Sequence, residues 1–254
     1  MNKGLRQKIK MNQPVIGTWN TMDSVLSTEV LASSGIDFLI IDFEHGPFQI
    51  ANVHNFINAS LLYNCSPIVR VPKNTQWMSL QALDQGANGI MMPGIKNKRS
   101  AKKFIDQIKY APVGKRGYSP FTKSGGFSNE NLNYKNEANE LTTSIIIIED
   151  MEGLNNIDEI LEVDALDVIY FGAYDLSQVL GFPGDVYNNR LLDLLKPAIE
   201  KVTKIGKFAG GFVPQNKDEL IFVKELGINF ITYGVDTNIL HKSLKAINDW
   251  FKFN

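Results

Sequence analysis

SIIIIEDMEGLNNIDEILEVDALDVIYFG, residues 144–172, contains the unit from which the fold of this chain can be predicted. Two short apolar runs, 144–150 and 166–172, enclose a segment, 153–163, in which apolar residues recur at helical spacing. Continuous apolar runs are typical of parallel strands that are covered on both faces, and parallel neighbours need a crossover that is usually a helix. The stretch therefore predicts one strand–helix–strand unit.

The same alternation continues in both directions along the chain. Further candidate strands are PVIGTWN (14–20), FLIIDFE (38–44), PIVRVP (67–72), GIMMPGI (89–95), FAGGFVP (208–214) and FITYGVD (230–236). Helical periodicity occupies the intervals 24–34, 51–63, 75–86, 98–109, 188–205, 216–226 and 237–252. Eight such units, without a visible domain boundary, predict a single α/β domain over residues 1–254, a closed (β/α)8 barrel of the TIM type.

One connection is much longer than the others. Residues 111–142, rich in Asn, Ser and Gly, separate the fourth helix from the fifth strand. By chain order this is an αβ connection, which in a barrel lies on the face away from the chemistry. Its length therefore predicts a second purpose, either a return over the barrel mouth or a contact with a neighbouring subunit.

The composition excludes several classes of protein. A net charge of -1 gives no electrostatic reason to expect nucleic acid or an anionic membrane as a partner. The N-terminus has no apolar run of signal-peptide length, and no stretch reaches the roughly 18 apolar residues of a membrane span. Cys65 is the only cysteine, so the chain can form neither an internal disulfide nor a thiolate metal cluster. We expect a cytoplasmic protein.

Two acidic residues follow neighbouring strands of the predicted barrel. Glu149 comes at the end of the fifth strand and Asp175 just after the sixth. Catalytic groups of such barrels gather at the carboxyl ends of the strands, so these carboxylates can converge on a hard divalent cation. The alternative is that each carboxylate caps the helix that follows it, since acids are favourable at helix N-termini.

The stretch DFEHGP, residues 42–47, supplies a candidate for proton transfer. Asp42 and Glu44 share one face of the second strand by alternation, and His45 begins the loop. A histidine held by a carboxylate is the usual proton-transfer unit near neutral pH. The alternative is a structural histidine at a turn.

Two further strand ends carry residues that can bind an anion. Arg70 lies between Val69 and Val71 in the third strand, so its charge needs a partner, either a substrate carboxylate or an internal acid. Gly172 ends the sixth strand, and backbone N–H groups after it can hold a carboxylate. Trp19 lies at the matching end of the first strand.

As an ordered set, these motifs resemble the HpcH/HpaI aldolase family, the class II pyruvate aldolases with the phosphoenolpyruvate-binding barrel fold. The motifs that carry the resemblance are GTW (17–19), IDFEHGP (41–47), PIVRVP (67–72), LDQGANGIMMP (83–93), PVGKRG (112–117), IIEDMEGLNNIDEIL (147–161), FGAYDLSQVLGFPG (171–184) and ITYGVDT (231–237). They extend over nearly the whole chain.

The resemblance implies a metal site and a proton-transfer group. Glu149 and Asp175 are implied to hold Mg2+ or Mn2+, with Co2+ as a further option. His45, together with Asp42 and Asp84, is implied to form the catalytic group that transfers protons. Without the resemblance, Asp84 reads only as a residue at the end of a helix.

The resemblance also implies a substrate site. Arg70 is implied to contact the pyruvate carbonyl or enolate oxygen. The amides after Gly172, those of Ala173 and Tyr174, are implied to hold the pyruvate carboxylate, and Trp19 to line the site. Family members cleave 4-hydroxy-2-oxoacids reversibly to pyruvate and an aldehyde, and they commonly assemble as hexamers. Small 2-oxoacid and aldehyde substrates and a homo-oligomer are therefore expected.

The sequence departs from the family pattern near the substrate. Ile147 replaces a glutamine that many relatives have, and Ala173 replaces a proline. Phe121 and Phe212 are expected near the aldehyde end, where no particular substrate is indicated. The aldehyde therefore stays open.

Three other functions compete with this one. A Schiff-base aldolase needs a lysine inside the barrel; the sixth strand has none, which leaves only Lys73 and Lys96 after the third and fourth strands. A citrate-synthase-like condensation, or another lyase reaction, can use the same metal and enolate with a different electrophile. A barrel without catalytic activity can serve as a scaffold, against which the retained polar strand ends argue.

Overall fold

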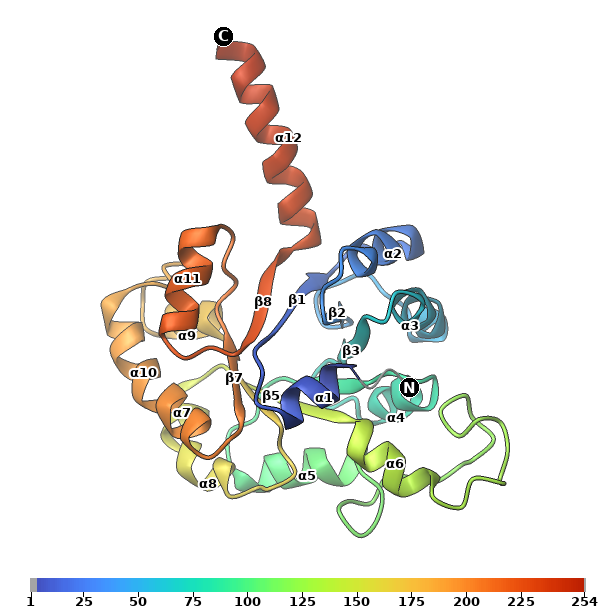
Figure 1. Cartoon of the computed structure of the whole chain (residues 1–254). Coiled ribbons are helices and arrows are strands. Elements are labelled where there is room, and N and C mark those ends of the chain that lie inside the picture. Colours follow the sequence, from blue (N-terminus) through green and yellow to red (C-terminus); the bar gives the residue numbers. More distant parts are fainter. Residues whose placement is uncertain (1–3, 254) are drawn as a thin grey trace.

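The structure, a computed structural model that describes residues 4–253, is a closed barrel of eight parallel strands in chain order (Figure 1). The strands are β1 (Val15–Asn20), β2 (Phe38–Asp42), β3 (Ser66–Arg70), β4 (Gly89–Met92), β5 (Thr143–Ile148), β6 (Val168–Phe171), β7 (Phe208–Gly211) and β8 (Phe230–Val235). Each strand pairs with the next, and β8 pairs with β1 to close the barrel. The (β/α)8 prediction is confirmed.

Every helical interval predicted from periodicity contains a helix. The helices are α2 (Val25–Ser33), α3 (Val53–Leu62) after the short 3-10 turn η1 (Ile50–Asn52), α4 (Gln76–Asp84), α5 (Lys98–Ile108), α7 (Met151–Asn155), α8 (Ile157–Leu161), α10 (Asn189–Lys204), α11 (Lys217–Glu225) and α12 (Asp236–Phe253). The interval 153–163 is divided between α7 and α8. The helices α1 (Gly4–Lys10), α6 (Tyr134–Leu141) and α9 (Ala173–Val179) lie outside the predicted intervals.

Side-chain alternation on the strands produces two apolar layers. On β5, Ile145 and Ile147 pack inside the barrel, whereas Ile146 and Ile148 pack in the layer between the strands and the helices. A strand with both faces buried must be apolar throughout, which is the reason that the strand runs show no polar alternation. Burial of both faces of each strand therefore explains both the continuous apolar runs in the sequence and the two apolar layers in the structure.

The N-terminal segment closes one end of the barrel. Leu5 of α1 is buried against Val15, Phe38 and Phe230, which lie at the beginnings of three strands. Arg6 of the same helix forms an ion pair with Asp167, just before β6. The sequence identifies this segment only as basic, because the two apolar residues that pack here, Leu5 and Ile9, are too few to establish a helical period.

The long connection, 111–142, folds against the helices and not over the carboxyl ends of the strands. The amide of Ser124 donates to the carbonyl of Asp84 at the end of α4 (3.1 Å). The hydroxyls of Tyr110 and Tyr134 lie 3.1 Å apart in a buried cluster. Of the two purposes predicted for this segment, the return over the mouth is not seen within the chain, and a subunit contact stays a prediction.

A buried carboxylate ties the last strand to the first. Asp236, which follows β8, accepts hydrogen bonds from the backbone amides of Thr21 (2.8 Å) and Met22 (2.9 Å) and from the side-chain amide of Asn20 (3.0 Å). Because three donors converge on one carboxylate, the loop after β1 is fixed to the beginning of α12.

The last helix leaves the barrel. Figure 1 shows α12 projecting away from the strands, whereas the interval 237–252 was expected to cover the barrel as the other helices do. Its apolar side chains are in large part exposed, including Leu244 (60%) and Ile247 (59%). The helix is amphipathic, but its apolar side finds no barrel surface in the same chain. No helix within residues 4–253 is long and apolar enough to cross a membrane.

Candidate active site

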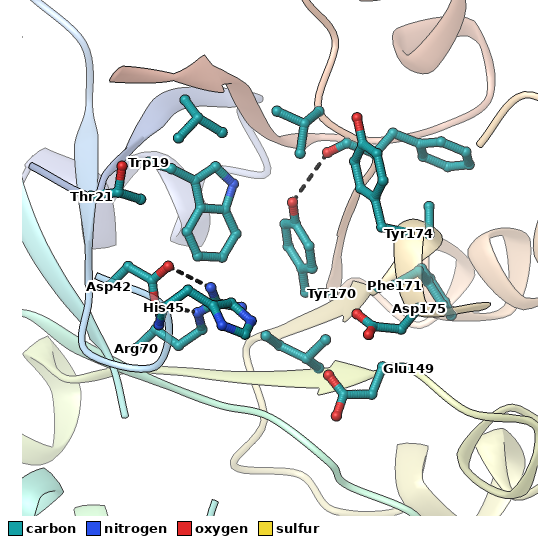
Figure 2. A pocket seen from close by; sticks show the side chains of 16 residues that line it. Trp19, Thr21, Asp42, His45, Arg70, Glu149, Tyr170, Phe171, Tyr174 and Asp175 are labelled. Carbon is teal, nitrogen blue, oxygen red and sulfur yellow. Dashed lines mark hydrogen bonds and ion pairs between the residues drawn. The ribbon is translucent and has the colours of Figure 1, made fainter. Parts of the chain in front are cut away.

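A cavity of about 310 Å³ opens at the carboxyl ends of the strands (Figure 2). The residues that line it are Trp19, Thr21, Asp42, His45, Arg70, Ile147, Glu149, Tyr170, Phe171, Gly172, Ala173, Tyr174, Asp175, Phe212, Val213 and Val235. Of the site residues predicted from the sequence, all but Asp84 and Phe121 are in this set. The carboxyl ends of the strands therefore bring residues from positions 19 to 235 of the chain together in one cavity, as expected for a (β/α)8 barrel.

Arg70 and Asp42 form a two-point ion pair on the floor of the cavity. They are register partners at the ends of β3 and β2. Arg70 Nε donates to Asp42 Oδ1 at 2.7 Å and Nη2 to Oδ2 at 2.5 Å, while the guanidinium carbon lies 4.4 Å from the centroid of Trp19. Nη1 lies 3.3 Å from Glu44 Oε2. The anionic partner that Arg70 required is thus an internal acid, and a guanidinium has five donors with which to meet a ligand as well.

Glu149 and Asp175 present their carboxylates to the same side of the cavity (Figure 2). Glu149 directly follows β5, and Asp175 lies in the first turn of α9. A Cβ on Gly172 would lie 2.9 Å from the Cβ of Glu149, so glycine lets the end of β6 pass close to this carboxylate. For Glu149 the helix-capping role belongs instead to its neighbour Asp150, which caps α7 by accepting from Gly153 N at 2.9 Å. Asp175 lies in the first turn of α9, where an acid is also favourable to the helix.

The donor set fits a hard divalent cation. Three acids line the cavity, Asp42, Glu149 and Asp175, and Arg70 occupies both carboxylate oxygens of Asp42. Within residues 4–253 no group of three or more His, Cys, Asp or Glu side chains is arranged as a metal site. Mg2+ is usually held by one or two carboxylates, with water and substrate in its other positions. Two oxygen ligands facing an open cavity meet that requirement.

Lys73, considered from the sequence only for the Schiff-base alternative, contacts one of these acids. Lys73, in the loop after β3, forms an ion pair with Oε1 of Glu149. This hydrogen bond raises the pKa of Lys73, although burial acts in the opposite direction. Lys96 pairs instead with Asp150 (3.0 Å) and Glu152 (3.2 Å). Neither lysine lines the cavity, so the Schiff-base alternative gains no support.

Glu44 adds negative charge beside the cavity. Its carboxyl group is half-buried, and burial raises the pKa of Glu44 above its ordinary value. The guanidinium of Arg70 lowers this pKa, whereas the negative charge of Glu149 raises it further. This part of the barrel mouth therefore favours an added positive charge.

His45 lies exposed at the rim of the cavity. Asp42 Oδ1 accepts hydrogen bonds from the backbone amides of Glu44 (3.1 Å) and His45 (3.3 Å), so this carboxylate shapes the turn that carries the histidine. Asp84 lies away from the cavity, at the end of α4, where it pairs with Arg116 at 2.6 Å. One chain thus brings His45 to Asp42 but not to Asp84, whose role in proton transfer stays a prediction.

Part of the cavity lining is aromatic, with Trp19, Tyr170 and Phe212 among its residues. The hydroxyl of Tyr170 donates to the carbonyl of Phe212 (3.1 Å) and lies 2.8 Å from Thr232 Oγ1, and burial raises the pKa of Tyr170 to about 12. Phe212 adopts a φ of 56°, which is unusual for a bulky residue, and its ring stacks on Tyr187 at 5.9 Å. Phe212 thus lines the cavity as expected, whereas Phe121 is exposed in the long connection.

Tyr170 is a wall residue that sequence reasoning missed. The signal was present, because alternation along β6 places residue 170 on the same inward face as Val168. An aromatic residue in an apolar run does not stand out as functional until the position of the cavity is known.

Comparison with known proteins agrees with this geometry. A family model described as HpcH/HpaI aldolase/citrate lyase matches residues 16–243. The 4-hydroxy-2-oxo-heptane-1,7-dioate aldolase of Klebsiella pneumoniae is 31% identical over 254 residues, which are 100% of this chain and 96% of that protein. Two solved structures are similar: citrate synthase SbnG (TM-score 0.88, 29% identity, 98% of this chain and 97% of that one) and an HpcH/HpaI aldolase/citrate lyase family protein from Burkholderia cenocepacia (TM-score 0.91, 25% identity, 99% and 100%). The chain belongs to the HpcH/HpaI aldolase/citrate lyase family.

Proposed function

We propose that this chain is a divalent-metal-dependent aldolase that reversibly cleaves a 4-hydroxy-2-oxoacid to pyruvate and an aldehyde. The expected enzyme class, a carbon–carbon lyase, is confirmed by the family and by the aldolase relative. The observation that carries the proposal is the convergence of two carboxylates and one guanidinium, Glu149, Asp175 and Arg70, on a single cavity at the carboxyl ends of the strands.

Glu149 and Asp175 are the residues that hold the metal, Mg2+ or Mn2+ with Co2+ as a further option. A bound divalent cation polarises the carbonyl of a 2-oxoacid and stabilises the negative charge of its enolate. Arg70 adds fixed positive charge at the same oxygen, and its pairing with Asp42 holds the guanidinium in place before substrate arrives.

The remaining wall residues bind and orient the substrate. The backbone amides of Ala173 and Tyr174 receive the carboxylate of the oxoacid, and the position of both residues on the cavity wall supports this role. Trp19 and Tyr170 form an edge-to-face pair, with ring centroids 5.9 Å apart, that excludes water from the inner end of the cavity. Excluding water strengthens electrostatic interactions at the reacting oxygen.

His45 is the residue that takes the proton from the 4-hydroxyl group as the carbon–carbon bond breaks. Its exposed position on the lining of the cavity supports this role, because a substrate whose oxoacid end is held at Glu149 and Asp175 extends its other end toward solvent. Asp84 takes part only if a second copy of the chain brings its α4 end to this rim.

A panel of aldehydes with pyruvate and Mg2+ or Mn2+, followed for carbon–carbon bond formation, tests the proposal. Exhaustive chelation should abolish the reaction and added metal should restore it. Deuterium exchange at the pyruvate methyl group should require the metal as well. Full activity after verified metal removal would falsify the metal-dependent mechanism.

A condensation of the citrate-synthase type is the second candidate. The similarity to citrate synthase SbnG favours it. Product analysis with pyruvate and with oxaloacetate separates the two reactions, because only the aldolase releases a free aldehyde from a 4-hydroxy-2-oxoacid.

The proposal includes a homo-oligomer, a hexamer by family resemblance. The exposed apolar side of α12 supports it, because a stable chain in water rarely leaves so much apolar surface uncovered on one helix. Exposed Val25, Leu26 and Val30 on α2 offer a surface of matching character. A cytoplasmic location is part of the same proposal, and the single free, buried thiol of Cys65 supports it.

A further inference from the structure

Lys73 lies just outside the cavity lining, where its side chain is positioned by Glu149 and Gly94. Its ammonium group pairs with Glu149, although 54% of the side chain is exposed. The aliphatic part of the side chain crosses Gly94, in the loop after β4, where an added Cβ would lie 2.6 Å from Lys73 Cε. Gly94 therefore leaves the space through which the lysine reaches the carboxylate.

The ammonium group of Lys73 lies near more than one carboxylate. Besides its pairing with Glu149, Lys73 interacts through charge with Glu44 and Asp175. Arg70 is already engaged on both oxygens of Asp42. Lys73 thus acts directly on a carboxylate oxygen of Glu149, one of the two residues assigned to the metal.

We propose that Lys73 sets the charge balance of this site, weakening its hold on the divalent cation and strengthening its hold on the anionic oxoacid. The inference rests on the proposed function and deepens it. An ammonium group competes with the metal for the lone pairs of Glu149 and repels the metal across the carboxylate. The same positive charge attracts the anionic oxoacid. Lys73 therefore lowers the affinity for the metal and raises the affinity for the substrate.

The contrary possibility is that the pair is an ordinary surface ion pair. Exposed pairs of this kind contribute little to stability or binding. In that case the removal of Lys73 leaves both binding constants unchanged.

The experiment compares Lys73→Met with Lys73→Arg, which keeps the charge. The matched control is Lys96→Met: Lys96 is 48% exposed, follows the next strand, and pairs with Asp150 and Glu152 outside the cavity. The Mn2+ dissociation constant of the metal-free protein is measured by electron paramagnetic resonance of free Mn2+. The dissociation constant of oxalate, a planar dianion that resembles the enolate of pyruvate, is measured by calorimetry with saturating Mn2+.

Lys73→Met should bind Mn2+ about tenfold more tightly and oxalate about tenfold more weakly, the size expected for one unit charge a few ångströms away in a partly solvated site. Lys73→Arg and Lys96→Met should stay near wild type in both constants. If both constants of Lys73→Met are unchanged, or if they shift in the same direction, the inference is overturned.

One additional variant separates this inference from the proposed function. Glu149→Gln should lose Mn2+ binding, because it removes a charged ligand. If wild type and Glu149→Gln bind Mn2+ equally, the metal is not held at this cavity, and the proposed function fails together with the inference. If Glu149→Gln loses Mn2+ but Lys73→Met matches wild type, only the inference about Lys73 fails.

Discussion

Arg70 can have two roles, an internal ion pair and a contact with substrate. Its surroundings are compatible with both. Asp42 takes two of its donors, Glu44 approaches a third, and Trp19 covers one face of its guanidinium plane. These contacts fix the orientation of the side chain. A guanidinium that is fixed before the substrate binds needs little reorganisation when charge develops on the substrate.

Arg70→Lys keeps the positive charge but loses the planar fork that meets both oxygens of Asp42. We expect kcat/KM for aldol cleavage to fall by about 10²-fold or more, the scale seen when one oxyanion donor is removed. Steady-state kinetics at saturating metal measure this, with circular dichroism to verify the fold. Near-normal kinetics would mean that Arg70 serves the structure alone.

Lys109 leads to a prediction about pH and stability. Its ammonium group is buried and donates to the carbonyls of Asn139 (2.6 Å) and Thr142 (2.5 Å), and burial lowers the pKa of Lys109 to about 8. The unfolded chain, with the pKa near 10.5, binds more protons between these two values than the folded chain does. The free energy of unfolding should therefore rise with pH from about 8 to about 10.5, by up to about 3 kcal/mol from this group.

Urea unfolding at pH 7.5 and pH 10 measures the effect as the difference between wild type and Lys109→Met, in which other titrating groups cancel. Lys102→Met, at an exposed position of α5, the helix that ends just before Lys109, is the control and should behave like wild type. An equal pH response in wild type and Lys109→Met would contradict the prediction.

The sequence indicated the cavity residues at strand ends but not the partners of residues in loops. Glu149, Asp175 and Arg70 were predictable because barrel topology alone brings strand ends together. The pairing of Lys73 with Glu149, and of Asp84 with Arg116, depends on how loops pack on one another. No local pattern in a single sequence specifies such packing.

At the level of elements, the strands end earlier than their apolar runs. The predicted runs 38–44, 89–95 and 208–214 overshoot β2, β4 and β7, because apolar residues continue past the last paired residue. Phe43 and Ile95 continue into the outer apolar layer, and Phe212 turns into the cavity wall. Apolar composition reports burial, whereas a strand end is set by the register of its neighbours.

Ile147 is placed on β5 as alternation predicted, on the inward face with Glu149 beyond it. Glutamine at this position would add a polar group, and with it water, to a wall that now excludes water. We expect Ile147→Gln to lower activity on the native substrate while pyruvate methyl-proton exchange stays within about tenfold of wild type, since enolate formation depends on the metal and Arg70. Nuclear magnetic resonance in deuterium oxide follows the exchange.

The conservative variant Ile147→Val is the control, because it keeps the wall apolar. An equal fall in exchange and in turnover for Ile147→Gln would show that residue 147 acts on the enolate step itself. A wild type without metal-dependent exchange would argue against the aldolase assignment.

For the whole molecule, the sequence predicted eight helices around eight strands but not that the last helix leaves its own barrel. The apolar residues of α12 recur at helical spacing, which predicts that one face of the helix is buried. The spacing does not indicate which surface covers that face. Topology was predictable because alternating strands and helices have few arrangements. The placement of α12 was not, because a surface of the same chain and a surface of another copy satisfy the same pattern.

Leu244→Glu with Ile247→Glu should reduce the oligomer to smaller species, because two charges then lie on the apolar side of α12. Light scattering after size-exclusion chromatography measures the mass. Lys245→Glu, which changes charge on the same helix away from these two residues, is the control. A wild type that is monomeric at micromolar concentration, or a double variant of unchanged mass, would contradict the proposed assembly.

The seam between β1 and β8 has a consequence for synthesis on the ribosome. Val15 of β1 pairs with Phe230 of β8, and Asp236 accepts hydrogen bonds from residues 20–22. β1 therefore cannot form these contacts until the part of the chain that contains Phe230 and Asp236 has been synthesised. Until then β1 and β7 are open sheet edges, which are sites where chains associate wrongly. This barrel therefore closes only after residues up to Asp236 have left the ribosome, and a nascent chain that stalls before Phe230 has a reason to be shielded by chaperones.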